Sequence, residues 1–217
     1  MMNETRRAMM GVALAAPLAS LALAPRAALA EAPREGQDYR LVKPAQPTAV
    51  PAGKIEVIEF FWYGCPFCNS IEPLLKDWAA KQPDDVVFRK LHVPFGDRRH
   101  QQLFYTLESL GQTAEANEAV FRAIHVDRNP MDTADRMVAV LGKLGIDEKR
   151  FRDTFRSFDV NTRMRRAAQI VDAYGVDGVP AMAINGKYYT APSMAGSGVA
   201  ALTVIDHLIE IERKARG

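Results

Sequence analysis

Residues 58–68 of the chain read IEFFWYGCPFC, an apolar segment that ends in two cysteines. Cys65 and Cys68 are the only cysteines in the sequence, and their spacing lets a disulfide form and open with little backbone movement. A structural disulfide across so short a loop would add only about 2 kcal/mol in the chain-entropy model. A metal site would need further ligands, and the four histidines show no tight pairing with the motif. The spacing favours thiol-disulfide chemistry, with the structural and metal interpretations left open at this point.

The residues around the motif predict a parallel crossover unit. Residues 54–61 are nearly continuously apolar, as expected for a central strand covered on both faces. Pro66 suits the first turn of a helix, and apolar side chains recur at helical spacing up to about residue 82. A second buried strand is predicted for residues 86–93. The cysteines then lie at the carboxyl end of a strand and the amino end of a helix, where active sites of such sheets usually lie.

Residues 94–158 show several helical stripes and no strand pattern, which predicts a helical insertion. One stripe is formed by Phe151, Phe155 and Phe158. Asp147 and Asn161 are candidate N-caps, the second for a helix that runs to residue 174. Further on, Asn185-Gly186 between two apolar runs predicts a β-hairpin, and residues 198–213 predict a closing amphipathic helix.

Residues 1–30 carry the features of an export signal. A pair of arginines precedes an apolar stretch over residues 8–23, and residues 28–30 read Ala-Leu-Ala, which fits a signal-peptidase site. The stretch is shorter than the roughly 20 residues that span a bilayer, and it contains Pro17, so a cleaved signal is favoured over a permanent anchor. We predict cleavage after Ala30 and export to an oxidising compartment, by the Sec or the twin-arginine route.

The charge balance of the mature chain gives no support for nucleic-acid or anionic-lipid binding. Of the 28 basic and 26 acidic residues, the signal removes three arginines and one glutamate, which leaves 25 of each. A net charge near zero provides no electrostatic attraction to a polyanion.

The predicted order of elements, with the cysteine motif opening a helix and a Val-Pro pair opening the hairpin, resembles the DsbA family of periplasmic dithiol oxidases. The resemblance extends over the mature chain, and its blocks are Gly36-Gln37-Asp38-Tyr39, Ile58-Glu59-Phe60-Phe61, Lys90-Leu91-His92-Val93, Gly178-Val179-Pro180-Ala181-Met182 and Asn185-Gly186-Lys187-Tyr188. It implies an α/β protein with a thioredoxin fold and an inserted all-helical domain. The expected parts are a signal peptide (1–30), an N-terminal arm (31–53), the thioredoxin-like domain (54–93 and 159–217) and the helical insertion (94–158).

The resemblance also implies a function. The chain is expected to be a protein disulfide oxidoreductase that introduces disulfide bonds into reduced, unfolded exported proteins in the periplasm. Its redox-active group would be the Cys65–Cys68 disulfide, without any other cofactor or metal. A quinone-linked membrane protein of the DsbB type would reoxidise it, and the protein would act as a monomer. The alternatives are a periplasmic reductase or isomerase, and a non-catalytic peptide-binding chaperone.

Several residues receive expected roles. Cys65 is the candidate nucleophile, because the N-terminus of a helix favours a thiolate, and Cys68 is the resolving cysteine. By resemblance, Pro180 is a cis-proline opposite the cysteines, and Val179 before it pairs its backbone with an extended substrate. Pro66 and Phe67 belong to the same substrate-binding surface.

A buried carboxylate in a strand is costly without a partner, which draws attention to Glu59. By resemblance, Glu59 lies beneath the disulfide and pairs with Lys90, where the two tune proton transfer at Cys68. The alternative is a polar pair that faces water at the strand end. Glu72 belongs either to this network or to a solvated helix face, and His92 is expected on a partly exposed strand.

One position departs from the family. DsbA proteins usually carry His between the proline and the second cysteine, where this chain has Phe67. An imidazole there helps to hold the nucleophilic thiolate, so its absence predicts a smaller pKa shift at Cys65. The pKa of about 3.5 is the standard example for DsbA and is not assumed for this chain. Each pKa unit corresponds to about 30 mV, so Phe67 predicts a milder oxidant.

Overall fold

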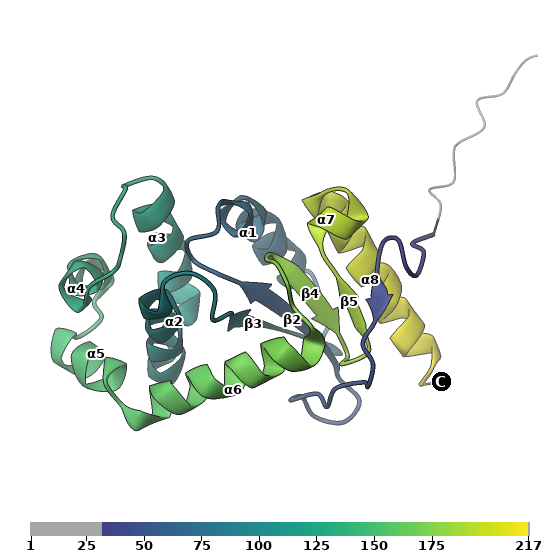
Figure 1. Cartoon of the computed structure of the whole chain (residues 1–217), viewed down its shortest axis with the longest axis horizontal. Helices are drawn as coiled ribbons and strands as arrows, with labels where there is room; N and C mark the ends of the chain where they lie inside the picture. The colour runs from purple at the N-terminus through teal and green to yellow at the C-terminus, as the bar shows by residue number, and fades with distance from the viewer. Residues whose placement is uncertain (1–31, 217) are drawn as a thin grey trace, which may run out of the picture. The chain divides into compact units, whose positions relative to one another are not determined.

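A five-stranded mixed sheet organises the computed structural model, which describes residues 32–216 (Figure 1). The strands are β1 (Arg40–Leu41), β2 (Ile55–Phe61), β3 (Val86–His92), β4 (Ala181–Ile184) and β5 (Tyr188–Thr190), in the order β1-β5-β4-β2-β3. β2 and β3 are parallel, and the other neighbours are antiparallel. The thioredoxin-like arrangement predicted from the sequence is confirmed, and the arm adds an edge strand to it.

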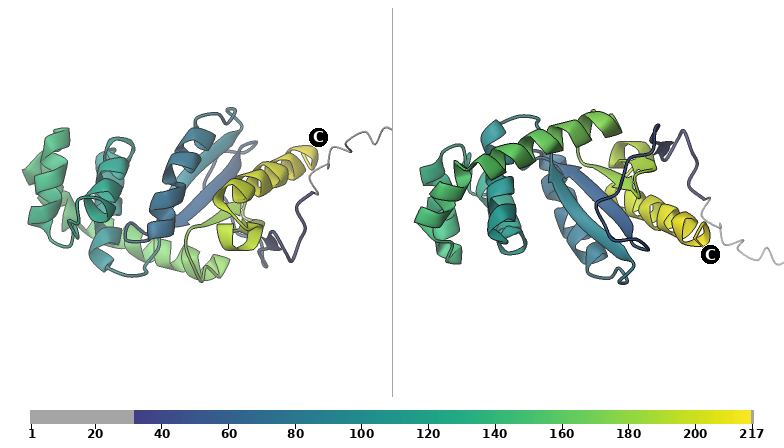
Figure 2. Two further views of the ribbon diagram at one scale, coloured as in Figure 1. Left: turned by 90° about the horizontal axis from the view of Figure 1, so that it is seen from above. Right: turned by 90° about the horizontal axis from the view of Figure 1, so that it is seen from below.

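The central strand β2 places alternate side chains on two faces of the sheet, and all seven of its residues are buried. Ile55 and Val57 pack with α1 (Pro66–Ala79) and with α8 (Gly198–Lys214) on one face. Phe60 points to the other face, where its ring lies 5.4 Å from the ring of Tyr174 in α6 (Phe158–Tyr174). Figure 2 shows α1 and α8 on one side of the sheet and α6 on the other.

Helices fill the segment between β3 and α6, as the periodicity predicts. They are α2 (Arg98–Leu110), α3 (Thr113–His125), α4 (Ala134–Leu141), the 3-10 helix η1 (Gly142–Leu144) and α5 (Glu148–Phe155). Asp147 is the N-cap of α5, where its side chain accepts a hydrogen bond from the backbone N–H of Arg150. Residues from Ala32 onward form one compact unit, so the division into two domains stays a prediction.

Two local predictions in this region are wrong. The N-cap of α6 is Ser157, whose hydroxyl accepts from the backbone N–H of Val160, whereas Asn161 lies inside the first turn. A serine and an asparagine both suit an N-cap, so composition alone does not choose between them. Phe158 starts α6 and is 79% exposed, so it does not continue the buried stripe of α5.

The hairpin and the closing elements agree with the sequence. Residues 185–187 join β4 to β5, and Asn185 and Gly186 have φ angles of 50° and 71°, the left-handed values that a tight hairpin turn requires. A short helix, α7 (Pro192–Ala195), precedes α8 and had no signal in the sequence. No helix within residues 32–216 is both long and apolar enough to cross a membrane. The predicted signal peptide lies outside the described residues.

Candidate active site

The two cysteines open helix α1 at the carboxyl end of β2. Cys65 is the N-cap of α1, Pro66 occupies the first turn, and Cys68 lies one turn further in. Both are unbonded thiols, and Cys68 is fully buried whereas Cys65 retains 6% exposure. The sulfur of Cys65 accepts a hydrogen bond from the backbone N–H of Cys68 at 3.4 Å. This places the accessible sulfur where a helix N-terminus stabilises negative charge.

The electrostatics of the two thiols differ. A hydrogen bond from the Cys68 thiol is the main cause that lowers the pKa of Cys65 to about 6, and backbone N–H groups of Cys68 and Phe67 add to it against the opposing effect of burial. The same hydrogen bond, together with burial, raises the pKa of Cys68. Cys65 therefore deprotonates first and is the better nucleophile and leaving group.

The loop before β4 faces the cysteines. The Val179-Pro180 peptide bond is cis, and the carbonyl of Val179 lies 3.5 Å from the sulfur of Cys65, whose thiol donates to it. Residues more than a hundred positions apart in the chain thus meet at the reactive sulfur. The position predicted for Val179 and Pro180 agrees with the structure.

A buried ion cluster lies beneath α1. Glu59 faces Lys90 across the β2–β3 register and is fully buried. Lys90 Nζ lies 2.5 Å from Glu59 Oε2 and 2.5 Å from Glu72 Oε2, and Asn117 donates to Glu72 at 2.6 Å. A polar pair facing water, the alternative from the sequence, is therefore wrong for Glu59.

Burial and charge compete in this cluster, with opposite outcomes for the acid and the lysine. Burial prevails at Glu59. It raises the pKa of Glu59, although the neighbouring Lys90 opposes the effect. Burial also disfavours the charge of Lys90, but the two carboxylates outweigh it and hold the pKa of Lys90 above its usual value. The hydrogen bond to Cys65 and burial are the main causes of the raised pKa of Cys68, and the negative charge of Glu59 adds a smaller contribution.

Two histidines hold the backbone just before the motif. His92 Nε2 accepts from the Tyr63 N–H at 3.2 Å, and its Nδ1 donates to the Val93 carbonyl at 2.9 Å. His125 Nε2 donates to the Tyr63 carbonyl at 2.7 Å. His92 is fully buried, so the expectation of partial exposure is wrong. The sequence contained no signal for His125 or Asn117, because both contacts come from α3, far along the chain.

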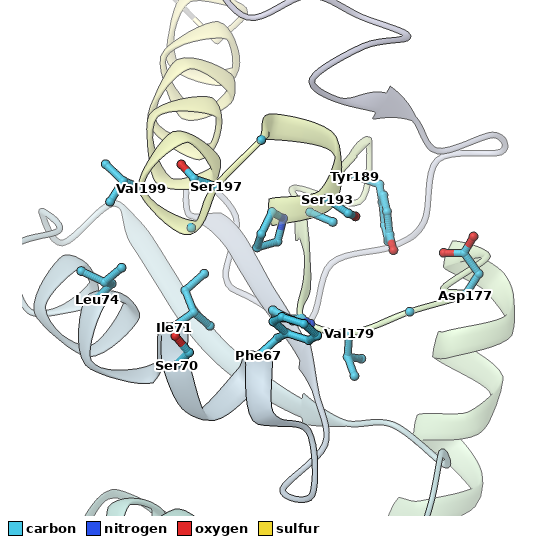
Figure 3. Close-up of a pocket in the computed structure, with 16 residues that line it drawn as sticks. Phe67, Ser70, Ile71, Leu74, Asp177, Val179, Tyr189, Ser193, Ser197 and Val199 are labelled. Carbon is cyan, nitrogen blue, oxygen red and sulfur yellow. The ribbon is translucent and has the colours of Figure 1, made fainter.

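A cavity of about 570 Å³ lies beside the motif, and Figure 3 shows the side chains that line it. Phe67 and Val179 lie between its ends, and Phe67 is 72% exposed. Ile71, Leu74 and Val199 line one end, and Tyr189 and Asp177 line the other. Pro180 also contributes to the lining, and Pro66 does not. Within residues 32–216, no group of three or more His, Cys, Asp and Glu side chains is placed to hold a metal ion.

One known protein family matches most of the chain. The family described as DSBA-like thioredoxin domain matches residues 56–210. The thiol:disulfide interchange protein DsbA of Pseudomonas aeruginosa is 40% identical over 209 residues, which cover 95% of this chain and 99% of that protein. DsbA of Azotobacter vinelandii is 42% identical over 183 residues, which cover 83% and 85%.

Solved structures of DsbA proteins share the fold of this chain. The crystal structure of Pseudomonas aeruginosa DsbA superposes with a TM-score of 0.80 at 40% identity, over 84% of this chain and 96% of that one. The oxidoreductase DsbA from Xylella fastidiosa gives a TM-score of 0.79 at 29% identity, over 85% and 100%. The similarity therefore covers the sheet, the cysteine helix and the helical segment together.

Proposed function

This chain belongs to the DsbA family and is a thiol-disulfide oxidoreductase, and on that premise we propose how its residues oxidise reduced proteins in the periplasm. The observation that carries the proposal is the contrast between the cysteines. The pKa of Cys65 is lowered to about 6, whereas that of the buried Cys68 is raised. A disulfide between such a pair opens readily, because one of its two sulfurs is a stabilised thiolate after reduction.

The first step forms a mixed disulfide. A substrate thiolate attacks the sulfur of Cys65, the bond between Cys65 and Cys68 breaks, and Cys68 leaves with the electron pair. Since the Cys68 sulfur is fully buried, its thiolate takes up a proton. Glu59, whose pKa is raised by burial, is the proposed relay that takes up a proton from solvent and passes it to this thiolate, and Lys90 holds Glu59 in place.

The second step releases the product. A second substrate thiolate attacks the substrate sulfur of the mixed disulfide, a substrate disulfide forms, and Cys65 leaves as a thiolate. Two electrons have moved from the substrate sulfurs to the enzyme pair. The low pKa of Cys65 speeds this departure, because a thiol of lower pKa is the better leaving group.

Substrate binding is assigned to the surface around the reactive sulfur. The backbone of Val179, whose carbonyl lies 3.5 Å from that sulfur, would pair with an extended client segment, and Pro180 fixes the loop. The exposed ring of Phe67 would contact apolar side chains of the client, with Pro66 beside it at the start of the helix.

Compartment and partners complete the proposal. Residues 1–30 support export by their sequence, with cleavage near Ala30. The periplasm supplies reduced, unfolded clients, and a membrane quinone-linked reoxidase of the DsbB type would restore the disulfide. The protein would act as a monomer, use no cofactor beyond Cys65 and Cys68, and bind no nucleic acid.

The test uses oxidised protein and a reduced, unfolded ribonuclease, with recovery of ribonuclease activity as the readout. The wild type is expected to restore activity in proportion to its disulfide content. Cys65→Ser should abolish the reaction, and Cys68→Ser should not turn over, because it lacks the disulfide. In a parallel assay with glutathione disulfide as the oxidant, a protein that speeds recovery equally well as Cys65→Ser would be a chaperone and not an oxidase. Reduction of insulin without oxidation of ribonuclease would identify a reductase.

A further inference from the structure

The cavity beside the cysteines is chemically different at its two ends. The end between α1 and α8 is mainly apolar: Leu74 and Val199 there are 40% and 63% exposed, and the hydroxyls of Ser70 and Ser197 lie beside them. The other end carries the carboxylate of Asp177 and the phenol of Tyr189, with Phe67 and Val179 between the two ends (Figure 3). A client segment that follows the cavity therefore meets an apolar surface on one side of the reactive sulfur and an acidic group on the other.

Asp177 carries the acidic character of that end. Its side chain is exposed, and no ion pair engages it within the described residues 32–216. The cation near Tyr189 is Arg40, which donates to the carbonyls of Tyr174 and Gly175 and lies 3.9 Å over the Tyr189 ring. Burial raises the pKa of Tyr189 to about 12, and the charge of Asp177 adds to the effect, so the phenol is neutral at pH 7.

We propose that this cavity selects client segments with an apolar residue on one side of the reacting cysteine and a lysine or arginine on the other, and that Asp177 is the residue that recognises the cation. The inference rests on the proposed oxidase function and adds the substrate class. Asp177 is a specificity-determining residue in this account and takes no part in sulfur chemistry.

The position of Asp177 in the loop before β4 limits where along the client segment the basic residue can lie. The client cysteine lies at Cys65, and the neighbouring client backbone pairs with Val179, whose carbonyl is 3.5 Å from that sulfur. Asp177 precedes Val179 by two positions in the same loop. An extended strand advances about 3.3 Å per residue, so the basic residue lies within about three positions of the cysteine.

The expected effect is moderate. Pairs between exposed charges are weak and are screened by salt, so a lysine should be preferred over a glutamate by about two- to fivefold in kcat/KM at low ionic strength. The preference should shrink as salt is added, while the contribution of the apolar residue should not. The cavity in this account sorts clients by their side chains and does not set the intrinsic rate of disulfide exchange.

The test measures oxidation of short dithiol peptides by the oxidised full-length mature protein. Each peptide carries leucine on one side of the reacting cysteine and lysine, glutamine or glutamate on the other, and each is made in both orders. In the order that fits the cavity, the wild type should prefer lysine over glutamine and glutamine over glutamate. Serine in place of leucine should slow all three.

Charge variants then identify the residue responsible. Asp177→Asn should remove the ratio between the lysine and glutamate peptides, and Asp177→Lys should reverse it. Asp172→Asn is the matched control, because it removes the same charge from an exposed position of α6 that does not line the cavity. An unchanged ratio in Asp177→Lys would overturn the inference while leaving the oxidase function intact. If the wild type oxidised none of the peptides, the proposed function itself would fail, and the inference with it.

Discussion

Phe67 stands between the two cysteines and supplies only its backbone N–H to the Cys65 sulfur. Its side chain is exposed and adds no dipole or charge to the thiolate. An imidazole at this position could place a charge or a hydrogen-bond donor near the Cys65 sulfur, whereas the phenyl ring offers only an exposed apolar surface. We therefore expect the departure from the usual family residue to weaken the oxidant while, under the proposed function, it favours apolar clients.

Phe67→His is expected to make the protein a stronger oxidant. A cationic or hydrogen-bonding ring lowers the pKa of Cys65, which stabilises the reduced form and raises the reduction potential by about 30 mV for each pKa unit. The measurement is equilibration with glutathione, with Phe67→Leu as the control that keeps an apolar side chain. A potential for Phe67→His equal to that of Phe67→Leu would show that this position does not tune the pair.

The second prediction at the scale of one residue concerns His92 and the pH dependence of stability. Burial lowers its pKa to about 3 from an ordinary value of 6.5, so the folded protein keeps the ring neutral. Between these two values the unfolded chain binds a proton that the folded one does not, and the free energy of unfolding falls as the pH falls. His92 contributes a slope of at most about 1.4 kcal/mol per pH unit in this window, and none above it.

Urea unfolding at several pH values from about 3.5 to about 7 tests this slope, because this range covers most of the interval between the two pKa values of His92. His92→Gln should flatten the curve relative to that of the wild type. If His92→Gln does not fold, an NMR titration of the wild type serves instead. A His92 ring that protonates near pH 6.5 would contradict the account.

At the scale of elements, the turn from β2 to α1 depends on small residues around Trp62. A Cβ atom on Gly64 would lie 2.3 Å from Trp62 Cζ2, and one on Gly96 would approach the same atom as closely. The indole is therefore enclosed by two glycines from different loops. This packing fixes the backbone that leads into Cys65.

Gly64→Ala is expected to destabilise the protein by about 1–3 kcal/mol, because the indole has to move out of an overpacked site. Gly142→Ala is the matched control, since a Cβ there meets nothing within 4 Å and its φ of −60° suits any residue. Chemical denaturation of both variants measures the difference. Equal stabilities would mean that Trp62 is free to adjust.

The elements also show what the sequence could and could not predict. Strand β2, the cysteine helix and the hairpin were predictable because periodicity, Pro66 and Asn185-Gly186 act locally. The hydrogen bond from His125 to the Tyr63 carbonyl depends on how α3 packs and leaves no pattern in the sequence. The pairing of Glu59 with Lys90 was predictable only from the resemblance to the family, because a buried acid in a strand does not indicate which residue pairs with it.

For the whole molecule, the redox state of the pair is linked to folding. The pKa of Cys65 falls from 9.0 to about 6 in the folded protein, so the folded state stabilises a thiolate. A group whose pKa is depressed on folding contributes stability above its unfolded pKa and loses that contribution as the pH falls through the folded value. The oxidised protein has no such titration, because its thiols are joined.

The reduced form should therefore gain stability relative to the oxidised form as the pH rises from about 6 to about 9. The gain is about 1 kcal/mol at pH 7, and it increases further toward pH 9. Paired denaturation curves of reduced and oxidised protein at several pH values measure it. A stability difference that does not depend on pH would contradict the assignment of Cys65 as the stabilised thiolate.

The reduction potential of the Cys65–Cys68 pair tests the central claim, that this DsbA family member is an oxidant of moderate strength, most directly. Starting from about −120 mV for the standard DsbA example, and allowing about 30 mV for each of the pKa units between about 3.5 and the value at Cys65, the account predicts about −200 mV. Equilibration of the mature protein with glutathione redox buffers measures it, with thiol trapping as the readout. A potential at or below that of thioredoxin, about −270 mV, would mean that the pair works as a reductant and would contradict the account.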